Sequence, residues 1–198
     1  MQAAVKRFSH SGHDAWQGFS ERRVAVILVF VWALAEATVW PFAADFLLAA
    51  LLLVRRPRFW VLAAACIAGM ATGGVVTVLV AHAWPSFALG LLRDLPLMTG
   101  ALIDGAADMI ADHGVAGFLI QPWGGIPFKA WAVQSGQLGL SPWLVIPAFI
   151  AARATRMLMT AVIAHLLGRA LRRGLRDWFA LIAPLYLAGC AAVLVALS

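Results

Sequence analysis

Five ionisable side chains stand inside long apolar stretches of this sequence of 198 residues: Glu36, Asp45, Lys129, Arg153 and Arg156. A charge at the centre of a bilayer costs at least ~2.5 kcal/mol on insertion scales, so such residues need partners, water or a charged ligand. Arg153 and Arg156 are three residues apart, which places both on one face of a helix. Because a guanidinium donates two parallel hydrogen bonds and stays charged at any working pH, this pair is suited to bind a phosphate.

Each of these residues also has a structural interpretation. In that alternative the two arginines only form a network with Glu36 and Asp45, or Arg156 extends toward the inner edge of the membrane. The two acids flank Pro41. Burial disfavours their charged form and a nearby arginine favours it, so they are candidates to take up a proton during transport. Lys129 either steers a phosphate headgroup or extends its ammonium to the membrane surface.

The elements that must position these residues are long apolar runs. Apolar residues make up 63% of the chain and charged residues 12%, whereas soluble domains are roughly half apolar and a quarter charged. A hydrocarbon core of ~30 Å requires ~20 such residues in a row. Runs of this length cover 24–54, 60–84 and 145–167, and a slightly shorter one covers 179–197. We therefore expect one all-α, polytopic membrane domain over 24–198, after a basic cytoplasmic tail, 1–23.

The first run, 24–54, is too long for one straight span and contains Pro41, which removes a backbone donor. We predict a re-entrant hairpin that turns near Pro41 and a second one, over 115–141, that turns near Pro127. Broken helices of this kind are allowed only where protein covers them or where they line a cavity. Full spans are then expected at 60–84, 143–168 and 179–197, with an outside loop at 85–114 that holds an amphipathic helix.

The positions of lysine and arginine orient this layout, because cytoplasmic loops carry an excess of both. Eleven of the fifteen fall on the predicted inner side: Lys6, Arg7, Arg22, Arg23, Arg55, Arg56, Arg58, Arg169, Arg172, Arg173 and Arg176. The outside loop holds only Arg93 against Asp94, Asp104, Asp108 and Asp112. The last three are four apart, which predicts a solvated helix face, with a cation site as the alternative. We expect a multi-pass protein of a bacterial inner membrane with a cytoplasmic N-terminus, and no nucleic-acid partner.

The two halves of the chain share an order of features. A Pro-Phe pair is followed by another proline and then by an Ala-His pair at the end of a run: Pro41-Phe42, Pro57 and His82, and again Pro127-Phe128, Pro142 and His165. In the predicted layout the first hairpin opens from the inside and the second from the outside, so the repeat is inverted. Paired, proline-interrupted apolar segments are typical of transporters that bind substrate near the middle of the bilayer.

Small and aromatic residues add predictions about packing. Gly69, Gly73 and Gly74 stand at helical spacing, which predicts the close approach of another helix. Most tryptophans stand near run ends or turns, as in the aromatic belts at membrane surfaces. Cys66 and Cys190 are interpreted as small buried hydrophobic residues.

The stretch Gly125-Ile126-Pro127-Phe128-Lys129 through Ser135-Gly136, followed by Phe149, Arg153 and Arg156, resembles the second re-entrant loop and following helix of the DedA family of SNARE-associated or VTT-domain membrane proteins. The likeness is greatest to the short members and covers roughly residues 30–170. The first half is similar, with an acid on either side of an aromatic-proline turn: Glu36, Trp40-Pro41 and Asp45. It departs from the family where Asp45 stands instead of a glutamate soon after the proline, and where the first span lacks a tyrosine.

The resemblance implies a membrane transporter that moves a lipid phosphate, undecaprenyl phosphate or a phospholipid, between leaflets and is coupled to the proton motive force. The residues it assigns are Arg153, Arg156 and Lys129 for substrate, Glu36 and Asp45 for proton coupling, and Pro41, Pro127 and Gly136 at the hairpin turns.

The expected partners are membrane lipids and protons, with a homo-oligomer left open. No catalytic activity, cofactor or metal is expected, since no nucleophile has a base within helix reach and no histidine has a ligand-spaced partner. Three alternatives remain: a proton-coupled exporter of small cations, a membrane-embedded lipid-phosphate enzyme, and a non-transporting assembly protein.

Overall fold

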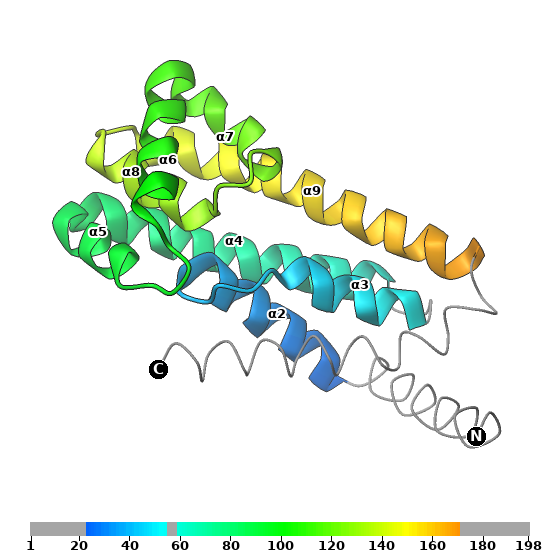
Figure 1. Ribbon diagram of the computed structural model, residues 1–198. Helices are drawn as coiled ribbons and strands as arrows, with labels where there is room; N and C mark the ends of the chain where they lie inside the picture. Colours follow the sequence, from blue (N-terminus) through cyan, green and yellow to red (C-terminus); the bar gives the residue numbers. More distant parts are fainter. Residues whose placement is uncertain (1–22, 55–58, 171–198) are drawn as a thin grey trace, which may run out of the picture.

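The computed structural model describes residues 23–54 and 59–170, and this part of the chain is all-helical, with no strand (Figure 1). Its α-helices are α2 (Arg23–Thr38), α3 (Ala44–Val54), α4 (Phe59–Ala83), α5 (Pro85–Arg93), α6 (Gly100–His113), α7 (Gly117–Ile120), α8 (Phe128–Gln137) and α9 (Pro142–Ala170). Two 3₁₀ turns flank α7, η1 (Gly114–Ala116) and η2 (Gln121–Trp123). The predicted tail up to residue 22 and the predicted span 179–197 lie outside the described residues.

Two of these helices are long and apolar enough to cross a membrane, over Phe59–Ala83 and Pro142–Leu167. They have 25 and 26 residues and therefore run for about 37 Å, more than the ~30 Å of a hydrocarbon core. Over residues 161–167 of α9 the exposed side chains are apolar: Val162, Ile163, Leu166 and Leu167. Together, the two long apolar helices and this exposed apolar face favour a membrane protein.

The interruption between α2 and α3 covers residues 39–43 and contains Pro41, where the sequence predicts a turn. Proline has no N–H to continue the helical ladder. The amides of Val39 and Trp40 both donate to the carbonyl of Ala35, at 2.9 and 2.7 Å, which closes the end of α2. The first predicted hairpin is thus two helices joined by a short irregular segment.

The second interruption covers residues 124–127 and is preceded by shorter elements, since α7 has four residues and η2 three. Gly125 has a φ of 72°, which suits glycine, and Pro127 stands immediately before α8. Gly136, expected at a hairpin turn, lies instead in the last turn of α8. The bend after α8 is made at Gly139, with a φ of 67°. The prediction for Gly136 is therefore wrong in position.

The helices exchange packing partners at the two interruptions. In the first half, α2 packs along α4, and α3 packs on α9. In the second half, α7 packs on α9, and α8 packs on α4. Helices α2, α3 and α4 of the first half therefore correspond to α7, α8 and α9 of the second half. The contact of α2 with α4 matches that of α7 with α9, and the contact of α3 with α9 matches that of α8 with α4. Figure 1 shows the result, with α4 and α9 as the long central pair.

Glycines allow the closest of these contacts, which confirms the packing predicted for α4. A Cβ on Gly69 would clash with the carbonyl oxygen of Phe30, and a Cβ on Gly73 would lie 2.5 Å from that of Leu34. Both carbonyls belong to α2. Gly136 has the same role in α8, where a Cβ would clash with the carbonyl oxygen of Ala81 in α4.

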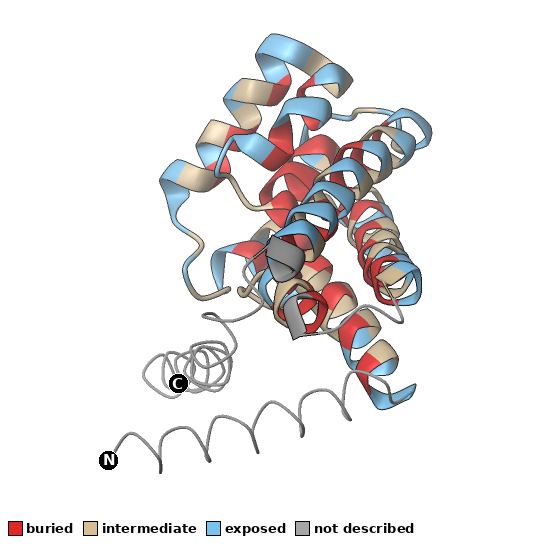
Figure 2. Ribbon diagram, turned by 90° about the vertical axis from the view of Figure 1, so that its right-hand side faces the viewer, coloured by how far each residue is buried: buried red, intermediate tan, exposed pale blue. Residues whose placement is uncertain are grey.

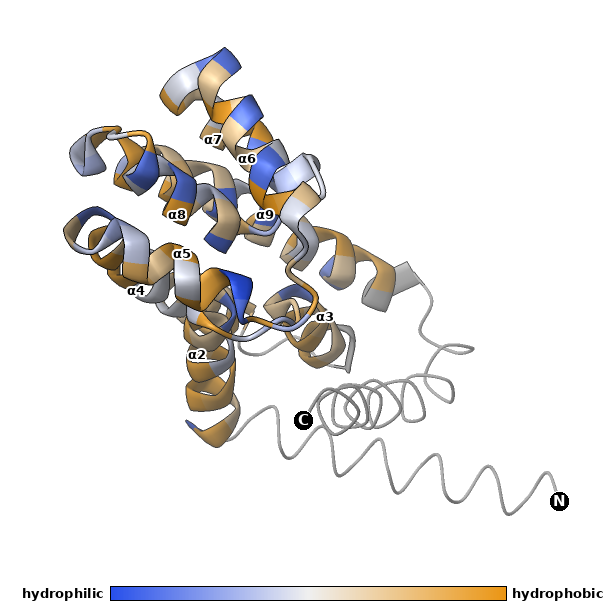
Figure 3. Cartoon of the chain, turned by 60° about the vertical axis from the view of Figure 1, so that its left-hand side comes forward, coloured by the Kyte–Doolittle hydropathy of each residue, from blue (hydrophilic) through white to orange (hydrophobic). Residues whose placement is uncertain are grey.

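The segment between α4 and α8 covers one end of the bundle. Helix α6 is amphipathic, as predicted, and buries Ile103, Ala106 and Ile110. It exposes all three of its aspartates, Asp104, Asp108 and Asp112, which fits the predicted solvated face. Figure 2 shows buried residues along the inner faces of the helices, and Figure 3 shows hydrophilic residues gathered over α5, α6 and α8 while α2 and α3 are mostly hydrophobic.

Candidate functional site

A cavity of about 280 Å³ lies where the two interruptions meet. The first interruption lines it with Trp40, Pro41 and Ala43, and the second with Gly125, Ile126 and Pro127. Pro96, Leu97 and Met98, in the connection between α5 and α6, line it as well. The predicted turn residues Pro41 and Pro127 are therefore brought to one site, whereas Gly136 is not. The charged lining residues are Glu36, Lys129, Arg153 and Arg156, with Asp45 directly behind Arg156.

The deeper of two ion pairs joins Arg153 of α9 to Glu36 of α2. The Nη2 atom of Arg153 lies 2.6 Å from Oε1 of Glu36, and their side chains are 4% and 12% exposed. The second carboxylate oxygen of Glu36 accepts a hydrogen bond of 2.8 Å from the amide of Ala44, the first residue of α3. An acidic group is favourable at a helix N-terminus, where amides lack helical partners. Glu36 therefore connects α2, α3 and α9.

The second ion pair joins Arg156 to Asp45 in the first turn of α3. The Nη2 atom of Arg156 donates to Oδ2 of Asp45 at 2.5 Å, and its Nη1 donates to the carbonyl of Pro122 at 3.2 Å. The Arg156 side chain is 29% exposed, far more than that of Arg153. Both arginines project from one face of α9, as their spacing predicts. Each guanidinium meets an acid from the other half of the chain.

Lys129 lies in the first turn of α8 and is buried. Its Nζ donates to the carbonyl of Trp40 in the first interruption, at 2.6 Å. An ammonium has three donors, and within the described part of the chain no carboxylate forms an ion pair with it. The ring of Phe128, next to it in sequence, lies 6.0 Å from the guanidinium carbon of Arg153. The cavity thus gathers all three predicted substrate-binding residues.

The charges around the cavity do not balance. Counting Asp45, three cations face two carboxylates among the described residues, which leaves an excess positive charge in a mostly buried site. Nε of Arg153 and Oδ1 of Asp45 are buried and have no hydrogen-bond partner in the described part of the chain. Unpaired buried charge is unfavourable, so the arrangement is suited to receive an anion.

Sequence reasoning missed several groups of this site. Gln121 is buried and donates from Nε2 to the carbonyl of Ile126 at 3.0 Å, holding the second interruption in place. An uncharged polar residue in an apolar run was the signal that could have found it. Leu97 has a φ of 66°, which is rare for a residue with a branched side chain, and no residue pattern predicts it.

Among the described residues, His82, His113, His165 and Cys66 are not part of the cavity lining. His82 places its ring nitrogens 2.7 Å from the carbonyl of Val78 and 2.6 Å from that of Leu140, which ties the end of α4 to the segment before α9. At the other end of α4, the ring of His165 contacts that of Phe59. Cys66 is buried, with Sγ 3.7 Å from Sδ of Met157, and Cys190 lies outside the described residues.

The described residues hold no group of three or more His, Cys, Asp or Glu side chains that could bind a metal ion. Comparisons of the chain with protein-family models, with curated proteins and with solved structures found no significant match.

Proposed function

We propose that this protein is a membrane transporter that moves a lipid phosphate between the leaflets of a bilayer. The observation that carries the proposal is the excess positive charge of the cavity, where, among the described residues, Arg153, Arg156 and Lys129 face two carboxylates. Guanidinium groups bind phosphate through paired hydrogen bonds. The excess also favours an anion over the small cation of the rival exporter hypothesis. The resemblance to the DedA family points to undecaprenyl phosphate or a phospholipid.

The depth of the cavity along the helices supports a site near the middle of the membrane. Arg153 is eleven residues after Pro142 and so lies about 17 Å along α9, close to half of a ~30 Å core. Trp60 and Trp84 are exposed at opposite ends of α4, and Trp143 is exposed at the start of α9. Tryptophans at these positions fit the two aromatic belts of a membrane protein.

The proposed layout is a multi-pass protein of a bacterial inner membrane, with two re-entrant hairpins that enter from opposite sides and a cytoplasmic N-terminus. The exchange of packing partners between the halves supports an inverted repeat. Single cysteines placed at Arg22 and Arg55, in a chain without Cys66 and Cys190, test it in sealed vesicles. Both are expected to be labelled from the same side; labelling from opposite sides would make the first hairpin a true span.

Protons enter the proposed cycle through the acids. Phosphate and Asp45 compete for Arg156, because one guanidinium cannot serve both fully. Protonation of Asp45 removes its charge and frees Arg156 for the ligand, and loss of that proton restores the ion pair and displaces the ligand. Glu36 is the second candidate, although its bond to the amide of Ala44 gives it a structural role as well.

The test replaces each arginine by lysine, which keeps the charge but loses the planar fork. Arg153→Lys and Arg156→Lys are each expected to reduce transport of a fluorescent polyprenyl phosphate in proteoliposomes by about tenfold or more, since one good pair of charged hydrogen bonds is worth ~1.5–3 kcal/mol. The comparison is made at matched expression and thermal stability, beside a phospholipid control. Wild-type transport in both variants would show that the arginines only balance the acids.

A further inference from the structure

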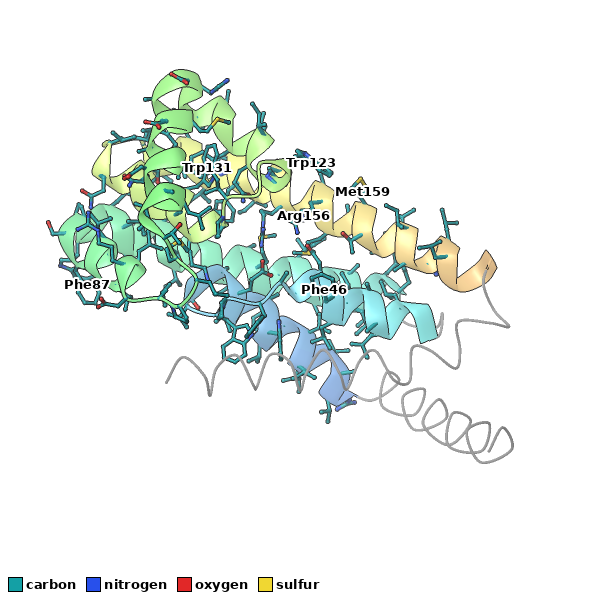
Figure 4. All side chains as sticks on the ribbon, viewed as in Figure 1. Phe46, Phe87, Trp123, Trp131, Arg156 and Met159 are labelled. Carbon is teal, nitrogen blue, oxygen red and sulfur yellow. The ribbon has the colours of Figure 1, made fainter. Side chains whose placement is uncertain are left out.

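Arg156 of α9 lines the cavity and its side chain is 29% exposed, so the cavity reaches the outside of the protein beside its ion pair with Asp45 of α3. Figure 4 shows three exposed apolar side chains near Arg156: Phe46, Trp123 and Met159, which are 60%, 58% and 40% exposed. Each of them stands close in the sequence to Arg156 or to a residue that Arg156 contacts. Phe46 follows Asp45, Trp123 follows Pro122, and Met159 stands three residues after Arg156 on the same helix face.

Arg156 lies along the length of α9 and not at either end of this helix. Arg156 is fourteen residues after Pro142 in α9, so it lies about 21 Å along the helix, well inside a ~30 Å hydrocarbon core. A partly exposed guanidinium at this depth borders lipid tails, where a lone charge is unfavourable. A dissolved inorganic anion gains no binding energy from the three apolar side chains. A molecule with an anionic head group and an apolar chain pairs with the guanidinium of Arg156 and also contacts the three apolar side chains.

We infer that Arg156, Phe46, Trp123 and Met159 form a lateral portal, through which a lipid phosphate passes from the bilayer into the cavity. This inference rests on the proposed function and adds the route and the chain contacts. The phosphate takes the place of Asp45 on Arg156, while the hydrocarbon chain lies against the three apolar side chains. Arg153 stays paired with Glu36 during entry, because that pair is buried and is fixed by the amide of Ala44.

The experiment uses wild-type protein in phosphatidylcholine vesicles and a long-chain polyprenyl phosphate with a photoactivatable diazirine in its chain. Photolabelling is expected on the segments that contain Phe46, Trp123 and Met159. Phe46→Ser and Met159→Ser are each expected to weaken binding of this lipid by about five- to tenfold through the loss of apolar contact. The matched control is Phe87→Ser, since Phe87 is 62% exposed on α5, at a distance from the portal, and its loss is expected to change nothing (Figure 4).

Binding of inorganic phosphate, measured on the same variants, distinguishes failure of the portal from failure of the proposed function. If the portal exists, Phe46→Ser and Met159→Ser leave phosphate binding unchanged and weaken only the lipid. If the lipid binds to the wild-type protein but equally well to both variants, or labels α5 instead, the portal is wrong and the proposed function stands. If the wild-type protein binds neither the lipid nor inorganic phosphate, the proposed function itself fails.

Discussion

The two halves of the molecule are alike in packing but supply opposite charges to the cavity. Each half sends one helix against a long helix and, after an interruption, a second helix against the other long helix. Yet both acids of the cavity, Glu36 and Asp45, come from the first half, and all three cations come from the second. The repeated packing thus sets the positions of the helices, and the charged site forms where acids of the first half meet cations of the second half.

Charged side chains of the cavity also hydrogen-bond to backbone groups at the two interruptions. In the first, the carbonyl of Trp40 accepts a hydrogen bond from Lys129 of the second half. Directly after it, the amide of Ala44 donates a hydrogen bond to Glu36 of the same half. Just before the second, the carbonyl of Pro122 in η2 accepts a hydrogen bond from Arg156. Backbone groups freed by a broken helix must find partners in a membrane. The charged side chains therefore stabilise the interruptions as well as the cavity.

The largest effect is expected from removing the buried cation, which tests whether the two ion pairs are equivalent. Arg153→Met leaves Glu36 buried without its partner and is expected to lower the free energy of unfolding by ~3–5 kcal/mol. Arg156→Met is expected to cost clearly less, because Arg156 is partly exposed. Thermal unfolding in detergent measures both. The double variant Glu36→Gln with Arg153→Met is expected to recover part of the loss, and equal losses for the two single variants would contradict the distinction.

A somewhat smaller effect is expected from glycine substitutions, which test whether the halves are alike in packing. Gly69→Leu separates α4 from α2, and Gly136→Leu separates α8 from α4, because each new side chain meets a backbone carbonyl. Overpacking of this kind costs about 1–3 kcal/mol, and similar losses are expected in the two halves. Gly90→Ala is the control, since nothing lies within 4 Å of its Cβ position. A loss at only one of the two glycines would show that the halves do not share a packing role.

The smallest effect is expected from Asp45→Asn, which imitates the protonated acid. In the wild-type protein, rising pH keeps Asp45 charged and paired with Arg156, so transport is expected to fall. In the variant Arg156 is free at every pH, and the fall with rising pH is expected to flatten. Glu36 and Arg153 remain as charged neighbours of the site. Transport of polyprenyl phosphate across a pH series measures the slope, and an unchanged slope would assign proton coupling to another group.

The sequence predicted the long elements well, because their physics is local. The apolar runs at 60–84 and 143–168 correspond to α4 and α9 within two residues, and Pro41 interrupts the chain where a missing donor requires it. The five charged residues were also found from sequence, since ionisable groups are conspicuous in apolar runs. Which acid pairs with which base was not predicted. The partners are 117 and 111 residues apart, and no local spacing encodes such a contact.

Gly136 in the fold and Leu97 in the cavity lining show why other parts of the structure escaped prediction. A glycine near a proline turn is typical of a bend, but Gly136 is needed for contact with α4, a distant element. Leu97 adopts a backbone conformation that its residue type disfavours, so only the surrounding structure can impose it. Both positions depend on tertiary packing, and neither carries a pattern of its own.

The separation of charge between the halves has a consequence for how the protein is made. Ribosomes add about 5–20 residues per second, so Arg153 and Arg156 are synthesised roughly 6–23 s after their acidic partners. Until α9 has been made, Glu36 and Asp45 lack the arginines with which they pair, and an unpaired carboxylate in hydrocarbon is strongly disfavoured. The first half must therefore wait at the membrane surface, in the insertion machinery or with its acids protonated. In the proposed layout the charges pair only after α9 has been made, and chains truncated before α9 are expected to be substrates for membrane proteases.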